Sequence, residues 1–117
     1  RFQIQEINKT ISFTEISKND FMLSPHSPEE AFLDLDRLKW PLRARNFRTG
    51  DKFIPLGING FKKVKDIFID NKIPSEERIK IPILVSSNDI VWVCGIRIDD
   101  RYKITQETKR ILRCKIE

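Results

Sequence analysis

The sequence predicts an α+β fold that is mainly β, a small β-sandwich-like domain with one or two short helices. Short stretches of alternating or wholly apolar residues recur along the chain, and turn residues separate them. Only residues 62–70 carry apolar side chains at the spacing of a helix. The 117 residues, 39% of them hydrophobic, are sufficient for one modest domain with a packed core.

We expect two parts, a strand-rich segment of residues 1–40 that packs on or links to the domain, and a C-terminal domain of residues 41–117. The elements expected in the first part are a hairpin of residues 2–7 and 10–16, a loop at 24–28, a strand at 31–35 and a turn at 36–40. Pro25 and Pro28 predict the loop because proline has no N–H to donate to a strand ladder. The chain begins with Arg1 and not with methionine, so we interpret it as a fragment of a longer protein.

The C-terminal part is expected to consist mainly of short strands joined by turns. Its first strand, residues 42–47, places Arg43 and Arg45 on the same face because side chains alternate along a strand. Residues 81–85 and 90–94 are apolar runs on either side of Ser-Ser-Asn-Asp, which predicts a hairpin buried on both faces. The remaining expected elements are a turn at 49–51, an extended run at 53–56, a glycine loop at 57–60, a short helical turn at 75–78, a mixed-charge loop at 97–101, an extended run at 102–105 and a strand at 111–116.

One amphipathic helix is predicted at residues 62–70. Lys62, Lys63 and Lys65 fall in its first turn and on its open side. Lysines at a helix start oppose the helix dipole, whereas an anion bound there would turn their effect favourable. We therefore expect a phosphate-binding groove whose rim joins Lys62 and Lys63 to Arg43 or Arg45 and to Arg78.

The positive charge is unevenly distributed. The net charge is +5, and the three consecutive segments 1–42, 43–78 and 79–117 carry −2, +4 and +3. Such an asymmetry favours an acidic partner more strongly than the total charge does.

The sequence contains no recognisable enzyme site, metal site or membrane span. It lacks a G-x-x-x-x-G-K-[ST] loop, a G-x-S-x-G elbow and an H-E-x-x-H pair. His26 is the only histidine and lies in the predicted loop, so zinc ligands are too few. Cys94 and Cys114 lie in apolar strand patterns and are expected to be buried, reduced and unbridged. No run reaches the roughly 18 apolar residues that a membrane span requires.

A dense, collinear motif covers about residues 41–112. Its positions are Gly50, Asp51, Pro55, Leu56, Gly57, Gly60, Lys62, Lys63, Phe68, Asp70, Lys72, Pro74, Arg78, Trp92, Val93, Gly95 and Arg97. In this order and spacing they resemble the C-terminal domain of tRNA(Ile)-lysidine synthetase. The departures are Ile58 where methionine is common, Phe61 where a small or polar residue is common, and Ser75 where a basic residue often follows the proline.

The resemblance implies a parent enzyme that uses ATP and lysine to convert the wobble cytidine of tRNA(Ile) to lysidine. It places catalysis in a separate N-terminal domain and gives this fragment no cofactor. The fragment is expected to hold the tRNA, particularly its acceptor arm, in the cytoplasm, with a fold similar to a domain of the phenylalanyl-tRNA synthetase β subunit. The expected tRNA-binding residues are Arg43, Arg45, Lys62, Lys63, Lys65, Lys72, Arg78 and Arg97. The alternative is a protein-interaction module that forms a homodimer or docks the catalytic domain.

Overall fold

The computed structural model describes residues 2–4, 9–23 and 26–117. The strands are β1 (Phe2–Ile4), β2 (Lys9–Ile16), β3 (Glu30–Asp34), β4 (Leu42–Arg45), β5 (Lys52–Phe53), β6 (Lys62–Lys63), β7 (Ile83–Ser86), β8 (Asp89–Val93), β9 (Arg97–Ile98) and β10 (Ile111–Ile116). The helices are α1 (Lys18–Leu23), α2 (Val64–Asp70) and α3 (Ser75–Arg78), with 3-10 turns η2 (Leu35–Arg37) and η3 (Asp100–Tyr102). The predicted mainly-β composition with short helices is confirmed.

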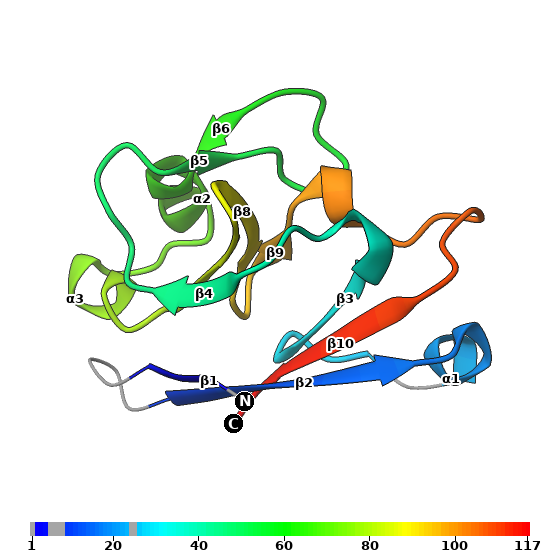
Figure 1. Cartoon of the computed structure of the whole chain (residues 1–117). Helices are drawn as coiled ribbons and strands as arrows, with labels where there is room; N and C mark the ends of the chain where they lie inside the picture. Colours follow the sequence, from blue (N-terminus) through cyan, green and yellow to red (C-terminus); the bar gives the residue numbers. More distant parts are fainter. Residues whose placement is uncertain (1, 5–8, 24–25) are drawn as a thin grey trace.

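Two four-stranded antiparallel sheets form the body of the molecule (Figure 1). The first sheet has the strand order β1-β2-β10-β3, and the second has the order β4-β7-β8-β9. Strand β10 lies between β2 and β3, so the last strand of the chain completes a sheet that its first strands begin. The predicted N-terminal hairpin is confirmed for β1 and β2, while residues 5–7 of it lie outside the described part. The predicted division near residue 40 separates β1–β3 from β4–β10 along the chain, although β10 belongs to the first sheet, and it stays a prediction.

The second sheet is the middle layer of three. One apolar core fills the space between the sheets and includes Leu33, Trp92 and Leu112. A second core covers the other face of the second sheet, where Phe53 and Phe68 come from the β5–β6 ribbon and α2. Every residue of β7 is buried, because both of its faces are covered, and this explains why its sequence is apolar throughout. The hairpin predicted at residues 81–94 is therefore confirmed.

Two local expectations are wrong. Lys62 and Lys63 do not lie in the first turn of a helix; they form β6, which pairs with β5, and α2 begins at Val64. The loop expected at residues 97–101 begins instead with β9, which pairs with β8. A tight turn at Gly95, with φ of 79°, makes this return possible.

Cys94 and Cys114 are both buried in the inter-sheet core and form no disulfide, as predicted. Burial raises the pKa of Cys114 to about 12 and raises the pKa of Cys94 well above its usual value. Both groups are thus held as neutral thiols in the folded chain.

We expect both thiols to react slowly with a disulfide reagent in the folded chain and rapidly after unfolding. Above the ordinary thiol pKa of 9.0 the unfolded chain loses protons that the folded chain retains. The free energy of unfolding should therefore fall as the pH rises from about 9 towards 12. Reagent kinetics with and without urea, and urea unfolding on both sides of pH 9, would measure these effects. Rapid reaction of both thiols in the folded chain would contradict the prediction.

Within the described residues, no helix is long and apolar enough to cross a membrane. The same residues contain no group of three or more His, Cys, Asp or Glu side chains placed to hold a metal ion.

Candidate functional site

The β5–β6 ribbon presents two lysines on its outer side. The antiparallel register places Lys52 opposite Lys63 and Phe53 opposite Lys62. Phe53 is fully buried beneath the ribbon, so the residues that alternate with it face outward. Lys52 and Lys63 are accordingly both exposed. We call the outer surface formed by Lys52, Phe61 and Lys63 the ribbon face.

The two outward lysines have the same charge and stand directly opposite each other. Like charges at directly paired positions of two strands destabilise the pairing. Among the side chains that the structure describes, neither Lys52 nor Lys63 has an acidic partner to offset this cost. A phosphate bound between the two ammonium groups would remove the repulsion and gain two charge-assisted hydrogen bonds. The lysine pair therefore lowers the stability of the free domain and raises its affinity for an anion.

An aromatic ring lies next to these lysines. Phe61 is 58% exposed, with Lys52 Nζ 5.2 Å and Arg101 Cζ 5.2 Å from its ring centroid. Both distances are within the range of cation–π attraction, so the ring holds the two cations close together. Sequence reasoning identified Lys63 but missed Lys52 and Arg101, and it recorded Phe61 only as a departure from the motif. Strand alternation counted outward from Phe53 is the signal that could have found Lys52.

A buried carboxylate fixes the loop that carries Phe61. Asp99 is 0% exposed, and its oxygens accept hydrogen bonds from the backbone N–H of Ile54 at 3.0 Å and of Arg101 at 2.8 Å. The Arg101 guanidinium donates two more, at 3.0 and 2.9 Å. The Asp100 carboxylate accepts a hydrogen bond from the backbone N–H of Gly57 at 3.1 Å, three residues after Ile54 in the loop that leads to Phe61. These contacts hold residues 54–57 and position Arg101 beside Phe61.

A second clamp orders the turn that leads into β5. The Arg45 guanidinium donates to both oxygens of Asp51, at 2.8 and 2.9 Å, and the backbone N–H of Arg48 donates to the same carboxylate at 2.8 Å. Burial alone would raise the pKa of Asp51, but these hydrogen bonds outweigh it and hold the pKa below its usual value. Arg45 is therefore engaged in holding the turn, with its side chain half-buried.

Three further predicted cations also have partners within the chain. Lys62, on the inner side of the ribbon, forms an ion pair with Asp70 at the end of α2. Arg78 donates from Nε to the carbonyl oxygen of Ile73 at 3.0 Å and packs over the Phe68 ring. Arg43 is exposed on β4 and donates to the carbonyl oxygen of Ser87 at 3.4 Å.

The other predicted cations, Lys63, Lys65, Lys72 and Arg97, have no acidic partner in the described part of the chain. Lys65 and Lys72 are exposed on α2 and just after it, whereas Arg97 is half-buried on β9. Because Lys62 and Lys63 lie on opposite sides of the ribbon, the single rim expected from the sequence does not form. Which of the eight cations contact RNA stays a prediction.

Comparison with known proteins identifies one family. The model of the "TilS substrate C-terminal domain" matches residues 42–115. The "tRNA(Ile)-lysidine synthase" of Clostridium acetobutylicum is 44% identical over 86 residues, which are 74% of this chain and 19% of that protein. The enzyme of the same name from Parabacteroides distasonis is 45% identical over 82 residues, 70% of this chain and 19% of that protein. The chain thus spans about a fifth of the length of these curated relatives.

Two solved structures show the same fold. A crystal structure of a TilS C-terminal domain aligns with a TM-score of 0.76 and 26% identity, over 93% of this chain and 83% of that one. An N-terminal fragment of the phenylalanyl-tRNA synthetase β subunit from Pyrococcus horikoshii aligns with a TM-score of 0.64 and 18% identity, over 74% of this chain and 27% of that one. The second likeness shows the fold alone. Both neighbours were expected from the sequence, and the expectation is confirmed.

Proposed function

Because the chain belongs to the family of the TilS substrate C-terminal domain, we propose that it is the tRNA-binding C-terminal part of a tRNA(Ile)-lysidine synthase. The parent enzyme, an ATP-dependent ligase of the cytoplasm, would join lysine to the wobble cytidine of tRNA(Ile). In this division of labour the catalytic domain of the same chain holds ATP and lysine. The part described here holds the tRNA, by its acceptor arm, and carries no catalytic residue.

One observation supports this proposal most directly, the opposed pair of Lys52 and Lys63 on the ribbon face. Phosphate groups along one strand of an RNA helix recur at a regular spacing, and a row of outward cations can neutralise several of them together. Lys65 and Lys72 extend the positive charge along α2 and the turn after it. Such contacts fix where the RNA lies without reading its sequence. They suit a domain that positions a tRNA while another domain modifies it.

A protein-interaction role is the second candidate, and a different surface favours it. Met22 and Leu23 on α1 are 79% and 77% exposed, which is unusual for adjacent large apolar side chains. A second copy of the chain, or the catalytic domain of the parent, could cover them. The two roles use different faces and are compatible with each other.

We expect the chain to bind a tRNA(Ile) transcript weakly and with a steep dependence on salt. Four to six phosphate contacts would give a slope of roughly −3 to −5 in a plot of log affinity against log salt. Filter binding at low and at physiological salt would measure the slope. With tRNA and lysine present, the isolated chain should consume no ATP. Binding without salt dependence, or no binding at low salt, would count against the proposal and in favour of the protein-interaction role.

A further inference from the structure

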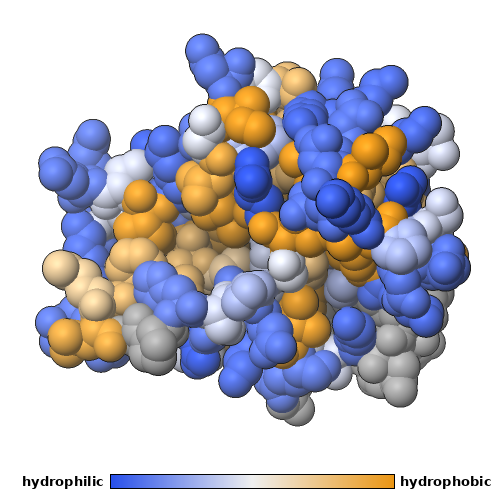
Figure 2. Space-filling model, turned by 180° about the vertical axis from the view of Figure 1, so that it is seen from behind, coloured by the Kyte–Doolittle hydropathy of each residue, from blue (hydrophilic) through white to orange (hydrophobic). Residues whose placement is uncertain are grey.

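A cavity of about 440 Å³ lies between β3 and α1 on one side and β8 and β9 on the other. Its lining residues are Phe21, His26, Pro28, Glu30, Ala31, Phe32, Leu56, Trp92, Ile96, Arg97, Ile98, Lys103 and Ile104. Seen from behind, apolar side chains gather in a hollowed region framed by hydrophilic ones (Figure 2). The site is open and mostly apolar, as small-ligand sites usually are.

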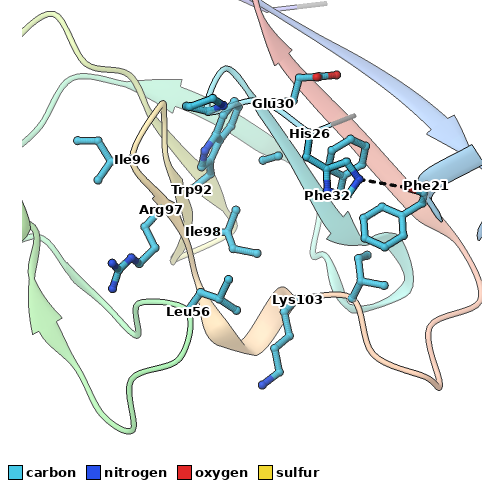
Figure 3. Close-up of a pocket in the computed structure, with 13 residues that line it drawn as sticks. Phe21, His26, Glu30, Phe32, Leu56, Trp92, Ile96, Arg97, Ile98 and Lys103 are labelled. Atoms are coloured by element: carbon cyan, nitrogen blue, oxygen red, sulfur yellow. Dashed lines mark hydrogen bonds between the residues drawn. The ribbon is translucent and has the colours of Figure 1, made fainter. Parts of the chain in front are cut away.

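One wall of the cavity is a cluster of three aromatic rings (Figure 3). The His26 ring centroid lies 4.8 Å from that of Phe21 and 4.5 Å from that of Phe32. A hydrogen-bond contact of 3.0 Å between His26 Nε2 and the carbonyl oxygen of Phe21 fixes the orientation of the imidazole. The rings are tilted against one another, by 32° for Phe21 and His26, 34° for His26 and Phe32 and 65° for Phe21 and Phe32. The cluster is therefore a preformed aromatic wall in which His26 is the exposed ring, and exposed aromatic rings bind nucleobases by stacking. Leu56 and Ile98 line the cavity across from it in Figure 3.

The charged groups of the lining leave one cation unmatched. Glu30 is ion-paired with Arg113 of β10, and Lys103 Nζ lies 3.1 Å from Asp100 Oδ1. Arg97 has no acidic partner in the ranges that the structure describes. Figure 3 shows the Arg97 and Lys103 side chains extending on the Leu56 side, away from the aromatic cluster. A matching ligand has an aromatic part for the ring cluster and an anionic group for Arg97.

We propose that this cavity binds one unpaired nucleotide of the RNA, with the base against the Phe21–His26–Phe32 cluster and a phosphate at Arg97. Its volume is within the range of pockets that hold small molecules. A paired base lies inside the helical stack and cannot reach such a wall, so the nucleotide must come from a single-stranded part of the RNA. This inference rests on the proposed tRNA-binding function and adds to it a site for an unstacked base.

The same loop links the cavity to the ribbon face. Leu56 lines the cavity, and Phe61, five residues later, belongs to the ribbon face. Five residues span at most about 18 Å, so a single RNA molecule can contact both places. Asp99 and Asp100 hold this loop, and they thereby fix the distance between the two contacts.

The test uses two RNA hairpins with the same stem, one blunt and one with four unpaired nucleotides at its 3′ end. The protein is the Trp40→Phe variant, which leaves Trp92 as the only tryptophan. Trp40 is largely exposed whereas Trp92 lines the cavity, so the remaining fluorescence reports on the site. We expect the overhang to raise the affinity about tenfold, the effect of one stacked base, and to change the Trp92 fluorescence.

Two substitutions in this background test the aromatic wall. His26→Ala should abolish the advantage of the overhang and leave the affinity for the blunt hairpin unchanged, while His26→Phe should keep the advantage because it restores a ring. His26 is exposed, so both variants should fold. Equal binding of the two hairpins, or an overhang advantage that survives His26→Ala, would overturn this inference and leave the proposed function in place. Failure of both hairpins to bind at low salt would overturn the proposed function and this inference with it.

Discussion

Replacing Asp99 with alanine is expected to lower the free energy of unfolding by about 2–4 kcal/mol. The carboxylate is 0% exposed and accepts four hydrogen bonds, two from backbone N–H groups and two from the Arg101 guanidinium. Alanine would leave the N–H of Ile54 without its acceptor and Arg101 without its principal counter-charge. Urea unfolding monitored by tryptophan fluorescence would measure the loss.

Two variants make this expectation specific. Asp99→Asn keeps the shape and one carbonyl oxygen, so it should cost less than alanine. Asp36→Ala removes an exposed carboxylate that forms only a surface ion pair with Arg110, and its effect should be within about 0.5 kcal/mol. An Asp99→Ala variant as stable as Asp36→Ala would show that Asp99 does not hold the loop. Where Asp99→Ala still folds, its RNA affinity should also fall, because Arg101 and Phe61 lose their support.

The strands that the sequence predicted correctly are those whose own order of apolar and polar residues shows which of their faces are buried. The apolar runs of β7 and β8 indicated burial on both faces, and the two cores on either side of the second sheet account for it. Alternation along residues 111–116 likewise predicted β10, with Leu112, Cys114 and Ile116 facing in. Leu112 and Cys114 are buried in the inter-sheet core, and the half-buried Ile116 packs against it. In each case the apolar residues that form the pattern are the same residues that contact a core.

The pairing of distant strands could not be predicted in the same way. Strand β10 pairs with β2 and β3, so that Ile111 stands opposite Ile16 on one side and Asp34 on the other. No local feature of either segment encodes that register; it arises from how the whole chain buries its apolar faces. The pairing of Lys62 with Phe53 was missed for a similar reason. The apolar spacing after Lys62 predicted a helix from residue 62, whereas α2 begins two residues later, at Val64.

The candidate site was only partly predictable for this same reason. The sequence drew attention to Lys63 through its neighbour Lys62, but the ribbon register sets Lys63 against Lys52 and turns Lys62 towards Asp70. The sequence also gave no sign that Arg45 forms an ion pair with Asp51. Charge counts therefore pointed to the segment that contains the ribbon, and strand pairing decided which of its cations face outward.

Changing Lys52 and Lys63 together to alanine should have the largest effect on RNA binding. If each lysine neutralises one phosphate, the double variant should flatten the log–log salt slope by nearly two units, because each contact contributes about 0.9. At about 0.1 M salt this corresponds to an affinity lower by roughly 10- to 60-fold. Folding should be almost unaffected, since exposed lysines contribute little to stability and the like-charge pair opposes the ribbon. Titration of a tRNA(Ile) transcript at several salt concentrations would measure both quantities.

The Lys62→Ala/Lys63→Ala variant separates strand register from sequence proximity. It carries the same change in charge, but Lys62 lies on the inner side of the ribbon beside Asp70, so the slope should flatten by only about one unit. Changing Lys109 and Lys115, beside and on β10 of the other sheet, controls for the loss of two charges and should leave the slope nearly unchanged. If the Lys52/Lys63 and Lys109/Lys115 variants weakened binding equally, the RNA would be responding to net charge alone. If the ribbon face binds phosphates, the salt slope should flatten most in the Lys52/Lys63 variant, less in the Lys62/Lys63 variant and least in the Lys109/Lys115 variant.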